Sequence, residues 1–273
     1  MRRLFPPPPA APRAAPDADP AAPGETADRA WSLAELADAY AYPPQTGPRA
    51  ARSWLRANMV ASLDGAAHHE GRSQPLSNDT DMRVFGVLRA LADAVVVGAE
   101  TVRKEGYRPA RARPAFADRR AAAGQAPAPA IAVLSASLEL DFSAPLFTEP
   151  RTPTLVLTGA GAPADRVHAA EAAGARVVFA GEGVGADPAR VPELLAGHGH
   201  YRLLTEGGPW VLGEFAGAGV LDELCLSLSP RVTAGEAPRI MNGPALEVPA
   251  DFTLESVLEE AGFLFTRYRR REG

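Results

Sequence analysis

Between residues 54 and 217 the chain alternates short apolar runs with stretches of helical spacing, and this alternation constrains the fold most. The run 94–98 is continuous and β-branched, which is typical of a strand covered on both faces. In segment 82–91 large apolar residues recur every third position, which predicts an amphipathic helix. Such alternation builds an α/β fold, with a mostly parallel central sheet and helices on both faces.

The expected elements follow from the same reading of apolar spacing and turn residues. The predicted strands are 54–62, 94–98, 131–134, 154–157, 176–179, 201–205, 223–229 and 263–268. The predicted helices start near Ser32, Ser77, Glu100, Pro163, Val191 and Trp210. Leucines at 224, 226 and 228 favour a half-buried strand, which with the terminal strand predicts an antiparallel C-terminal edge. Segment 107–130 has prolines and arginines but no apolar period, so we expect a long basic surface loop.

The first residues differ sharply in composition from the rest. Residues 1–23 hold eight prolines and seven alanines, too little apolar surface to offset the entropy of ordering. We therefore expect a disordered Pro/Ala-rich leader over 1–28, followed by one domain over 29–273. The basic residues at 267 and 269–271 are interpreted as a solvated end.

Charge and cysteine content exclude several classes of partner. The 28 basic and 33 acidic residues give a net charge of −5, which argues against a protein that coats nucleic acid or an anionic membrane. No apolar run approaches the roughly 20 residues of a membrane span. The single cysteine, Cys225, excludes an internal disulfide and suits a reducing, cytoplasmic location. The histidines at 68, 69, 198 and 200 lack ligand spacing, so we predict no metal and expect them exposed.

Two strand-to-helix turns are the main candidates for a ligand site. One follows the run 94–98 at Gly98 and Thr101, and the other follows Thr205 through Glu206 to Gly213. The free amides of a helix start, with the helix dipole behind them, suit a cofactor pyrophosphate. The alternative is an ordinary tight turn with a solvated Glu206.

Arg89 and the loop after Ser62 each allow two interpretations of their role. Arg89 follows Phe85 by four residues, on the core-facing flank of its helix, where it could clamp a substrate phosphate or pair with Asp93. The glycine-bearing loop 63–77 could close over a substrate, or form a surface turn.

These segments, taken together, resemble a known family. They are Asn58-Met59-Val60-Ala61-Ser62-Leu63-Asp64-Gly65, Leu88-Arg89-Ala90-Leu91-Ala92-Asp93, Gly98 with Thr101-Val102-Arg103, Leu204-Thr205-Glu206-Gly207-Gly208-Pro209, and Asp222-Glu223-Leu224 before Ser229-Pro230. Residues 53–269 are similar to the pyrimidine reductases, the reductase half of the bifunctional riboflavin-biosynthesis deaminase-reductase. The resemblance implies a dihydrofolate reductase-like fold and a cytoplasmic homodimer.

The resemblance also implies an activity and a set of site residues. The family reduces a phosphoribosylamino-pyrimidine with NADPH, transferring hydride to C1′ of the opened ribose. Ser73, Arg89 and Glu206 are then expected to bind this small heterocyclic substrate, with Glu105 and Glu206 orienting the acceptor or handling its proton. The residues expected along NADPH are Gly98, Thr101, Glu105, Ser135, Gly207, Gly208, Pro209, Trp210, Val211, Leu212 and Gly213.

The chain departs from the family pattern at three points. The zinc ligands of the deaminase half are absent, so we expect no deamination. Ala66 stands where many members have lysine, and Glu105 stands where the riboflavin enzymes usually have aspartate. Two alternatives therefore stay open: a dihydrofolate reductase-like activity on a pterin, and a nucleotide-binding module without turnover. Oxidation of NADPH with each candidate substrate distinguishes them.

Overall fold

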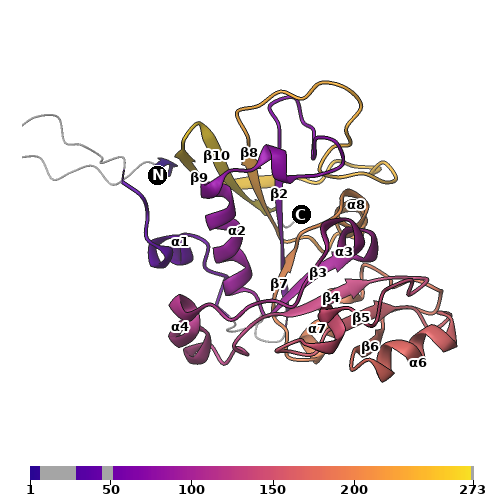
Figure 1. The fold of residues 1–273 in the computed structure, drawn as a ribbon. Coiled ribbons are helices and arrows are strands. Elements are labelled where there is room, and N and C mark those ends of the chain that lie inside the picture. Colours follow the sequence, from indigo (N-terminus) through magenta and orange to yellow (C-terminus); the bar gives the residue numbers. More distant parts are fainter. Residues whose placement is uncertain (7–28, 45–51, 272–273) are drawn as a thin grey trace, which may run out of the picture.

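The fold is built on a twisted mixed sheet, described here from a computed structural model (Figure 1). The structure describes residues 1–6, 29–44 and 52–271, and within these the sheet has ten strands in the order β1-β9-β10-β8-β2-β7-β3-β4-β5-β6. The strands are β1 (Arg2–Phe5), β2 (Trp54–Ala61), β3 (Ala94–Gly98), β4 (Ala130–Leu134), β5 (Leu155–Thr158), β6 (Arg176–Phe179), β7 (Arg202–Thr205), β8 (Glu223–Leu228), β9 (Phe252–Glu260) and β10 (Phe263–Arg270).

The parallel part of the sheet runs from β8 to β6, and the C-terminal edge is antiparallel. Strand β2 lies between β7 and β8, parallel to both, and β3 lies between β7 and β4. Strand β10 pairs antiparallel with β8 and β9. The predicted α/β class, with a mostly parallel sheet and an antiparallel edge, is confirmed.

Helices cover both faces of the parallel part, because its strands alternate apolar side chains between two cores. In β3, Val95 and Val97 face a core shared with α1 and α2, whereas Ala94 and Val96 face a core shared with α7 and α8. The helices are α1 (Leu33–Ala39), α2 (Asp79–Leu91), α3 (Ala99–Glu105), α4 (Ala117–Ala122), α5 (Pro145–Thr148), α6 (Ala164–Ala172), α7 (Val191–Gly197) and α8 (Pro209–Gly217), with 3₁₀ turns η2 (Gln74–Leu76) and η3 (Pro114–Phe116).

The predicted disordered leader is wrong at its first residues. Arg2 and Arg3 of β1 pair with Glu259 and Leu258 of β9, and the Met1 amino group lies 3.0 Å from the Glu260 carboxylate. A strand ladder uses backbone groups, so an edge strand needs little apolar surface of its own, and the prolines begin only after β1. Residues 7–28, the rest of the predicted leader, lie outside the described residues.

The predicted basic surface loop is also wrong in part, because it contains η3 and α4. The Arg120 side chain of α4 is buried and donates to the carbonyl oxygens of Ala90 and Ala92, at the end of α2. It therefore caps the last carbonyl groups of α2 and ties α4 to that helix.

Strand β9 and helix α5 were not predicted.

The predicted solvated end is wrong for Arg267, whereas Arg269 and Arg271 are exposed. Arg267 of β10 donates to Glu223 of β8 at 2.5 Å, and Arg56 of β2 lies 2.9 Å from the same carboxylate. Arg56 and Glu223 are almost fully buried. Burial alone would raise the pKa of Glu223, but the charges of Arg56 and Arg267 outweigh it and hold that pKa at about 2. This charged group fastens three strands together beneath the carbonyl groups of α1, to which Arg267 also donates.

Candidate functional site

The two predicted turns lie side by side at the carboxyl edge of the sheet. Strands β3 and β7 are direct neighbours, and the Gly98 amide donates to the Gly207 carbonyl oxygen at 3.2 Å. The Gly208 amide donates to the Thr101 hydroxyl at 2.9 Å. The two candidate turns are therefore in direct contact.

Glycines allow the two turns to pack this closely. A Cβ at Gly98 would lie 2.9 Å from the Val211 side chain, and a Cβ at Gly208 would lie 3.0 Å from the Thr101 hydroxyl. The peptide between Gly207 and Gly208 is cis. These glycines therefore serve the contact between the starts of α3 and α8, in addition to any approach by a ligand.

A cavity of about 740 Å³ opens in front of these turns. This volume lies in the upper part of the range of small-molecule sites, so two ligand groups can meet in it. Its walls come from the end of β2, the loop before α2, the α2 face, α3 with the segment after it, and the start of α8. The predicted site residues that line it are Ser73, Arg89, Gly98, Thr101, Glu105, Glu206, Gly208, Pro209, Trp210 and Val211.

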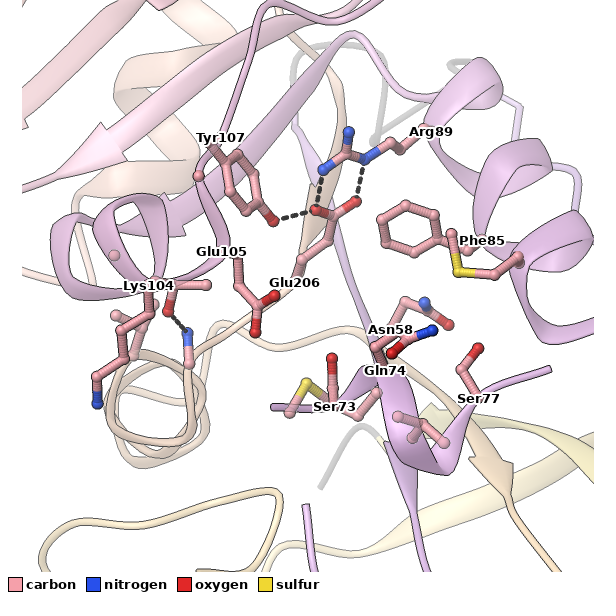
Figure 2. Close-up of a pocket in the computed structure, with 18 of the residues that line it drawn as sticks. Asn58, Ser73, Gln74, Ser77, Phe85, Arg89, Lys104, Glu105, Tyr107 and Glu206 are labelled. Carbon is pink, nitrogen blue, oxygen red and sulfur yellow. Dashed lines mark hydrogen bonds and ion pairs between the residues drawn. The ribbon is translucent and has the colours of Figure 1, made fainter. Parts of the chain in front are cut away.

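Glu206 accepts three side-chain hydrogen bonds in this pocket (Figure 2). Arg89 of α2 donates to both of its carboxylate oxygens, with Nε and Nη2 each at 2.6 Å, and the Tyr107 hydroxyl also donates to Oε2. The Glu206 side chain is 4% exposed and that of Arg89 is 24% exposed. The alternatives of a solvated Glu206 and of an Arg89–Asp93 pair are both wrong, since Asp93 binds Arg202 instead.

The directions of the pKa shifts of Arg89 and Tyr107 agree with a Glu206 carboxylate held between these two hydrogen-bond donors. Burial lowers the pKa of the Arg89 guanidinium, but the charge of Glu206 outweighs burial and keeps that pKa above its ordinary value. Burial, and then the charge of Glu206, raise the pKa of Tyr107 well above its usual range. Tyr107 therefore stays a hydrogen-bond donor and Arg89 stays a cation.

Four of the predicted cofactor residues lie outside the cavity wall. Ser135 follows β4, and its hydroxyl accepts the Leu138 amide at 3.0 Å. The Leu212 side chain is fully buried in the core beneath α8, and Gly213 packs against the backbone of the 242 loop. Gly207 contributes its carbonyl oxygen to the contact with Gly98. The rise of α8 explains the positions of Leu212 and Gly213, because a helix presents only its first turn to a site at its start.

Several pocket residues were not predicted from the sequence. Asn58 at the end of β2 and Tyr107 after α3 both reach the cavity, as do Arg108, Arg111 and Arg113. The expectation of exposed histidines is wrong for two of them, since His68 lines the cavity and is half-buried, and His200 is half-buried as well. Only the Arg89 part of the group around Glu206 carried a local signal, its spacing from Phe85.

Comparison with known protein families shows the family to which this chain belongs. A family model described as the RibD C-terminal domain matches residues 53–260. The chain belongs to this family. It is therefore a pyrimidine reductase-like oxidoreductase of the riboflavin-biosynthesis type, and the predictions of this family and of a reductase are confirmed.

Named relatives of the family come from distant organisms. The chain is 27% identical over 194 residues to a 2,5-diamino-6-ribosylamino-4(3H)-pyrimidinone 5′-phosphate reductase of Archaeoglobus fulgidus, covering 70% of this chain and 87% of that protein. It is 31% identical over 157 residues to a protein of the same name from Aquifex aeolicus, covering 57% and 65%.

Solved structures agree with this assignment. A pyrimidine reductase-like protein from Corynebacterium diphtheriae has a TM-score of 0.71 and 26% identity, with 81% of this chain and 93% of that chain covered. RibD of Acinetobacter baumannii has a TM-score of 0.65 at 18% identity, covering 82% and 60%, and shows the same fold. The predicted reductase architecture is thus confirmed at the level of the whole domain.

Within residues 1–6, 29–44 and 52–271, no group of three or more histidine, cysteine or acidic side chains is arranged to hold a metal ion. Over the same ranges, no helix is long and apolar enough to cross a bilayer.

Proposed function

We propose that this chain is an NADPH-dependent reductase of 6-ribosylamino-pyrimidine 5′-phosphates, the substrate class named for its relatives from Archaeoglobus and Aquifex. The observation that carries the proposal is the Arg89–Glu206–Tyr107 group, which lines the same cavity as the paired turns. A buried, oriented carboxylate near a helix start gives separate places for a heterocycle with N–H donors and for an anionic cofactor.

The start of α8 fits the pyrophosphate of a dinucleotide. Pro209, Trp210 and Val211 form its first turn and line the cavity, and the amides of Trp210 and Val211 have no acceptor within the helix at these positions. The Thr101 hydroxyl lies at the same place, bonded to the Gly208 amide. These groups would hold NADPH, which supplies the hydride when bound. Ser135 stays a predicted contact of its adenosine end.

Hydrogen-bonding groups that lack partners support a heterocyclic substrate. Within the described part of the chain, the Oδ1 atom of Asn58 is buried and has no hydrogen-bond partner. Such an acceptor calls for an N–H group from a ligand, because an unpaired buried carbonyl costs about 1–3 kcal/mol. The ring N–H and amino groups of a pyrimidinone offer that donor. The exposed Ser73 hydroxyl lines the same cavity, and its predicted substrate contact is part of this proposal.

Three arginines on one wall support a phosphorylated substrate. Arg108, Arg111 and Arg113 line the cavity, and none of them forms an ion pair with another described residue. A Cβ at Gly86 would overlap the Arg113 guanidinium, so this arginine lies directly on α2 beside Arg89. Since Arg89 is bound to Glu206, we assign the phosphate to these three arginines rather than to Arg89.

The reduction requires a hydride at C1′ and a proton at the attached nitrogen. As the hydride adds to C1′ of the imine, the π electrons of the C=N bond move to nitrogen, which takes the proton and becomes a secondary amine. Glu206 is held by Arg89 and Tyr107, so we assign it to orienting the pyrimidine. Glu105 is exposed, and its carboxyl group points into the cavity (Figure 2), so we assign the proton transfer to Glu105 or to water that it binds.

The test follows oxidation of NADPH by purified protein, with the ribosylamino-pyrimidine phosphate and with a dihydropterin in parallel. We expect turnover with the pyrimidine alone, and loss of turnover in a folded Glu206→Ala variant. Turnover with the dihydropterin alone, or NADPH binding without oxidation by either compound, would contradict the proposal.

The proposal extends to the oligomeric state and the location of the protein in the cell. We propose a homodimer, as in the resemblance, and the half-exposed leucines Leu224, Leu226 and Leu228 on one face of β8 are consistent with a second subunit covering them. A cytoplasmic location stays a prediction, based on the single cysteine, Cys225, which is buried and reduced.

A further inference from the structure

We propose that Tyr107 is a positioning residue, which fixes the Glu206 carboxylate so that one acceptor site of that carboxylate stays open for an N–H group of the substrate. The inference rests on the proposed function, because it assigns a role within the same site. Neither the sequence nor the family resemblance pointed to this tyrosine.

The hydrogen-bond inventory of Glu206 leads to this assignment. A carboxylate has about four acceptor sites, two on each oxygen. Oε2 accepts from Arg89 Nη2 and from the Tyr107 hydroxyl, so both of its sites are used. Oε1 accepts from Arg89 Nε alone. The carboxylate therefore keeps one open site, and that site is on Oε1.

Arg89 alone would not determine which oxygen stays open. Its two N–H donors form a symmetrical fork, so each carboxylate oxygen would keep one open site without the tyrosine. Tyr107 breaks this symmetry, because it comes from a different element and approaches only Oε2. Its hydroxyl therefore leaves the open acceptor site of the carboxylate on Oε1 alone.

The backbone at Gly106 and two aromatic rings fix the positions of Tyr107 and Arg89. Gly106 ends α3 in the left-handed conformation, with φ of 62°, and the Tyr107 amide then donates to the Val102 carbonyl at 3.1 Å. The Arg89 guanidinium lies over the rings of Phe85 and Tyr107, at 4.6 and 5.2 Å from their centres. Tyr107 thus contributes a ring contact to Arg89 and a hydroxyl to Glu206, and these two can be separated by mutation.

The test is Tyr107→Phe, which removes the hydroxyl and keeps the ring. Tyr42→Phe is the matched control, because Tyr42 is also a half-buried tyrosine with an arginine, Arg56, over its ring, and its hydroxyl donates to the Leu203 carbonyl outside the cavity. We expect kcat/KM for the pyrimidine to fall about tenfold in Tyr107→Phe, which is about 1.4 kcal/mol. We expect no change in the Kd of NADPH, and wild-type kcat/KM in Tyr42→Phe.

A double-mutant cycle on substrate binding shows whether Tyr107 acts through Glu206, and this measurement does not require catalytic turnover. The Kd of the pyrimidine substrate is measured without cofactor for wild type, Tyr107→Phe, Glu206→Gln and the double variant, each with its melting temperature. We expect weaker binding in Tyr107→Phe, and a double variant that binds no more weakly than Glu206→Gln.

Wild-type binding in Tyr107→Phe, or independent effects of the two substitutions, would overturn the assignment. Equal losses of activity in Tyr107→Phe and Tyr42→Phe would also overturn it, because they would indicate a general effect on the fold. Substrate binding by the wild type without oxidation of NADPH would instead refute the proposed function and leave the binding cycle interpretable.

Discussion

The Arg89–Glu206 pair permits a sharp stability prediction, because its two members differ in burial. Arg89→Met leaves a carboxylate that is 4% exposed with only the Tyr107 hydroxyl as a partner. Glu206→Leu leaves a guanidinium that is 24% exposed, so water can replace part of what is lost. Both replacements are apolar and close in volume to the residues they replace.

The difference in burial sets the expected magnitudes. Removing one partner of a buried pair costs about 3–5 kcal/mol, because the other charge is left without compensation. Arg89→Met should fall near the lower end, about 3 kcal/mol, since one hydrogen bond to the carboxylate remains. Glu206→Leu should cost about 1.5 kcal/mol. The double variant should unfold within about 1 kcal/mol of the wild type, since no charge is left buried.

Equilibrium unfolding in urea measures all four proteins at one pH and one salt concentration. The refuting results are a Glu206→Leu variant that is as unstable as Arg89→Met, or a double variant that shows the sum of the two single losses. Either result would mean that the pair is stabilised by contacts other than the charge compensation argued here.

Two further predictions concern the cofactor turn and the buried charges. Gly208→Ala should raise the Kd of NADPH about tenfold, because its Cβ would lie 3.0 Å from the Thr101 hydroxyl, whereas Gly197→Ala, whose Cβ meets no atom within 4 Å, should leave that Kd unchanged in the same titration. Glu223 has a folded pKa of about 2, below the ordinary 4.5, so its stabilisation is present above about pH 4.5 and is lost as the pH falls toward 2. Urea midpoints should therefore drop more steeply between about pH 5 and pH 3 in the wild type than in Glu223→Gln, and equal slopes would contradict the assignment.

Most of the parallel sheet could be predicted because its signals are local. The run 94–98 is apolar enough to be covered on both faces, and it forms β3 with the predicted bounds. Helix α1 begins with the predicted Ser32 as its N-cap residue, whose side chain accepts the Glu35 amide while the Glu35 carboxylate accepts the Ser32 amide. Strands β1 and β9 were missed because an antiparallel edge is held by backbone pairing, which leaves little trace in apolar spacing.

The site was predicted less completely, since its central contacts are long-range. Glu206 lies 117 residues from Arg89 and 99 from Tyr107, so no local spacing could join them. Tyr107 directly follows the glycine that ends α3, inside segment 107–130, which was predicted as a basic loop without apolar period and so offered no spacing that singled it out.

The start of α8 shows how a sequence pattern and helix geometry can differ in extent. The family pattern extends the cofactor contacts from Gly208 through Gly213, yet α8 begins at Pro209 and rotates about 100° per residue. Its first turn faces the cavity, and by Leu212 the side chain has entered the core. Under the proposed function, a cofactor at this helix start would depend on amides and on the fit of Gly208 against Thr101, which is why a single methyl group at Gly208 is the change that tests it.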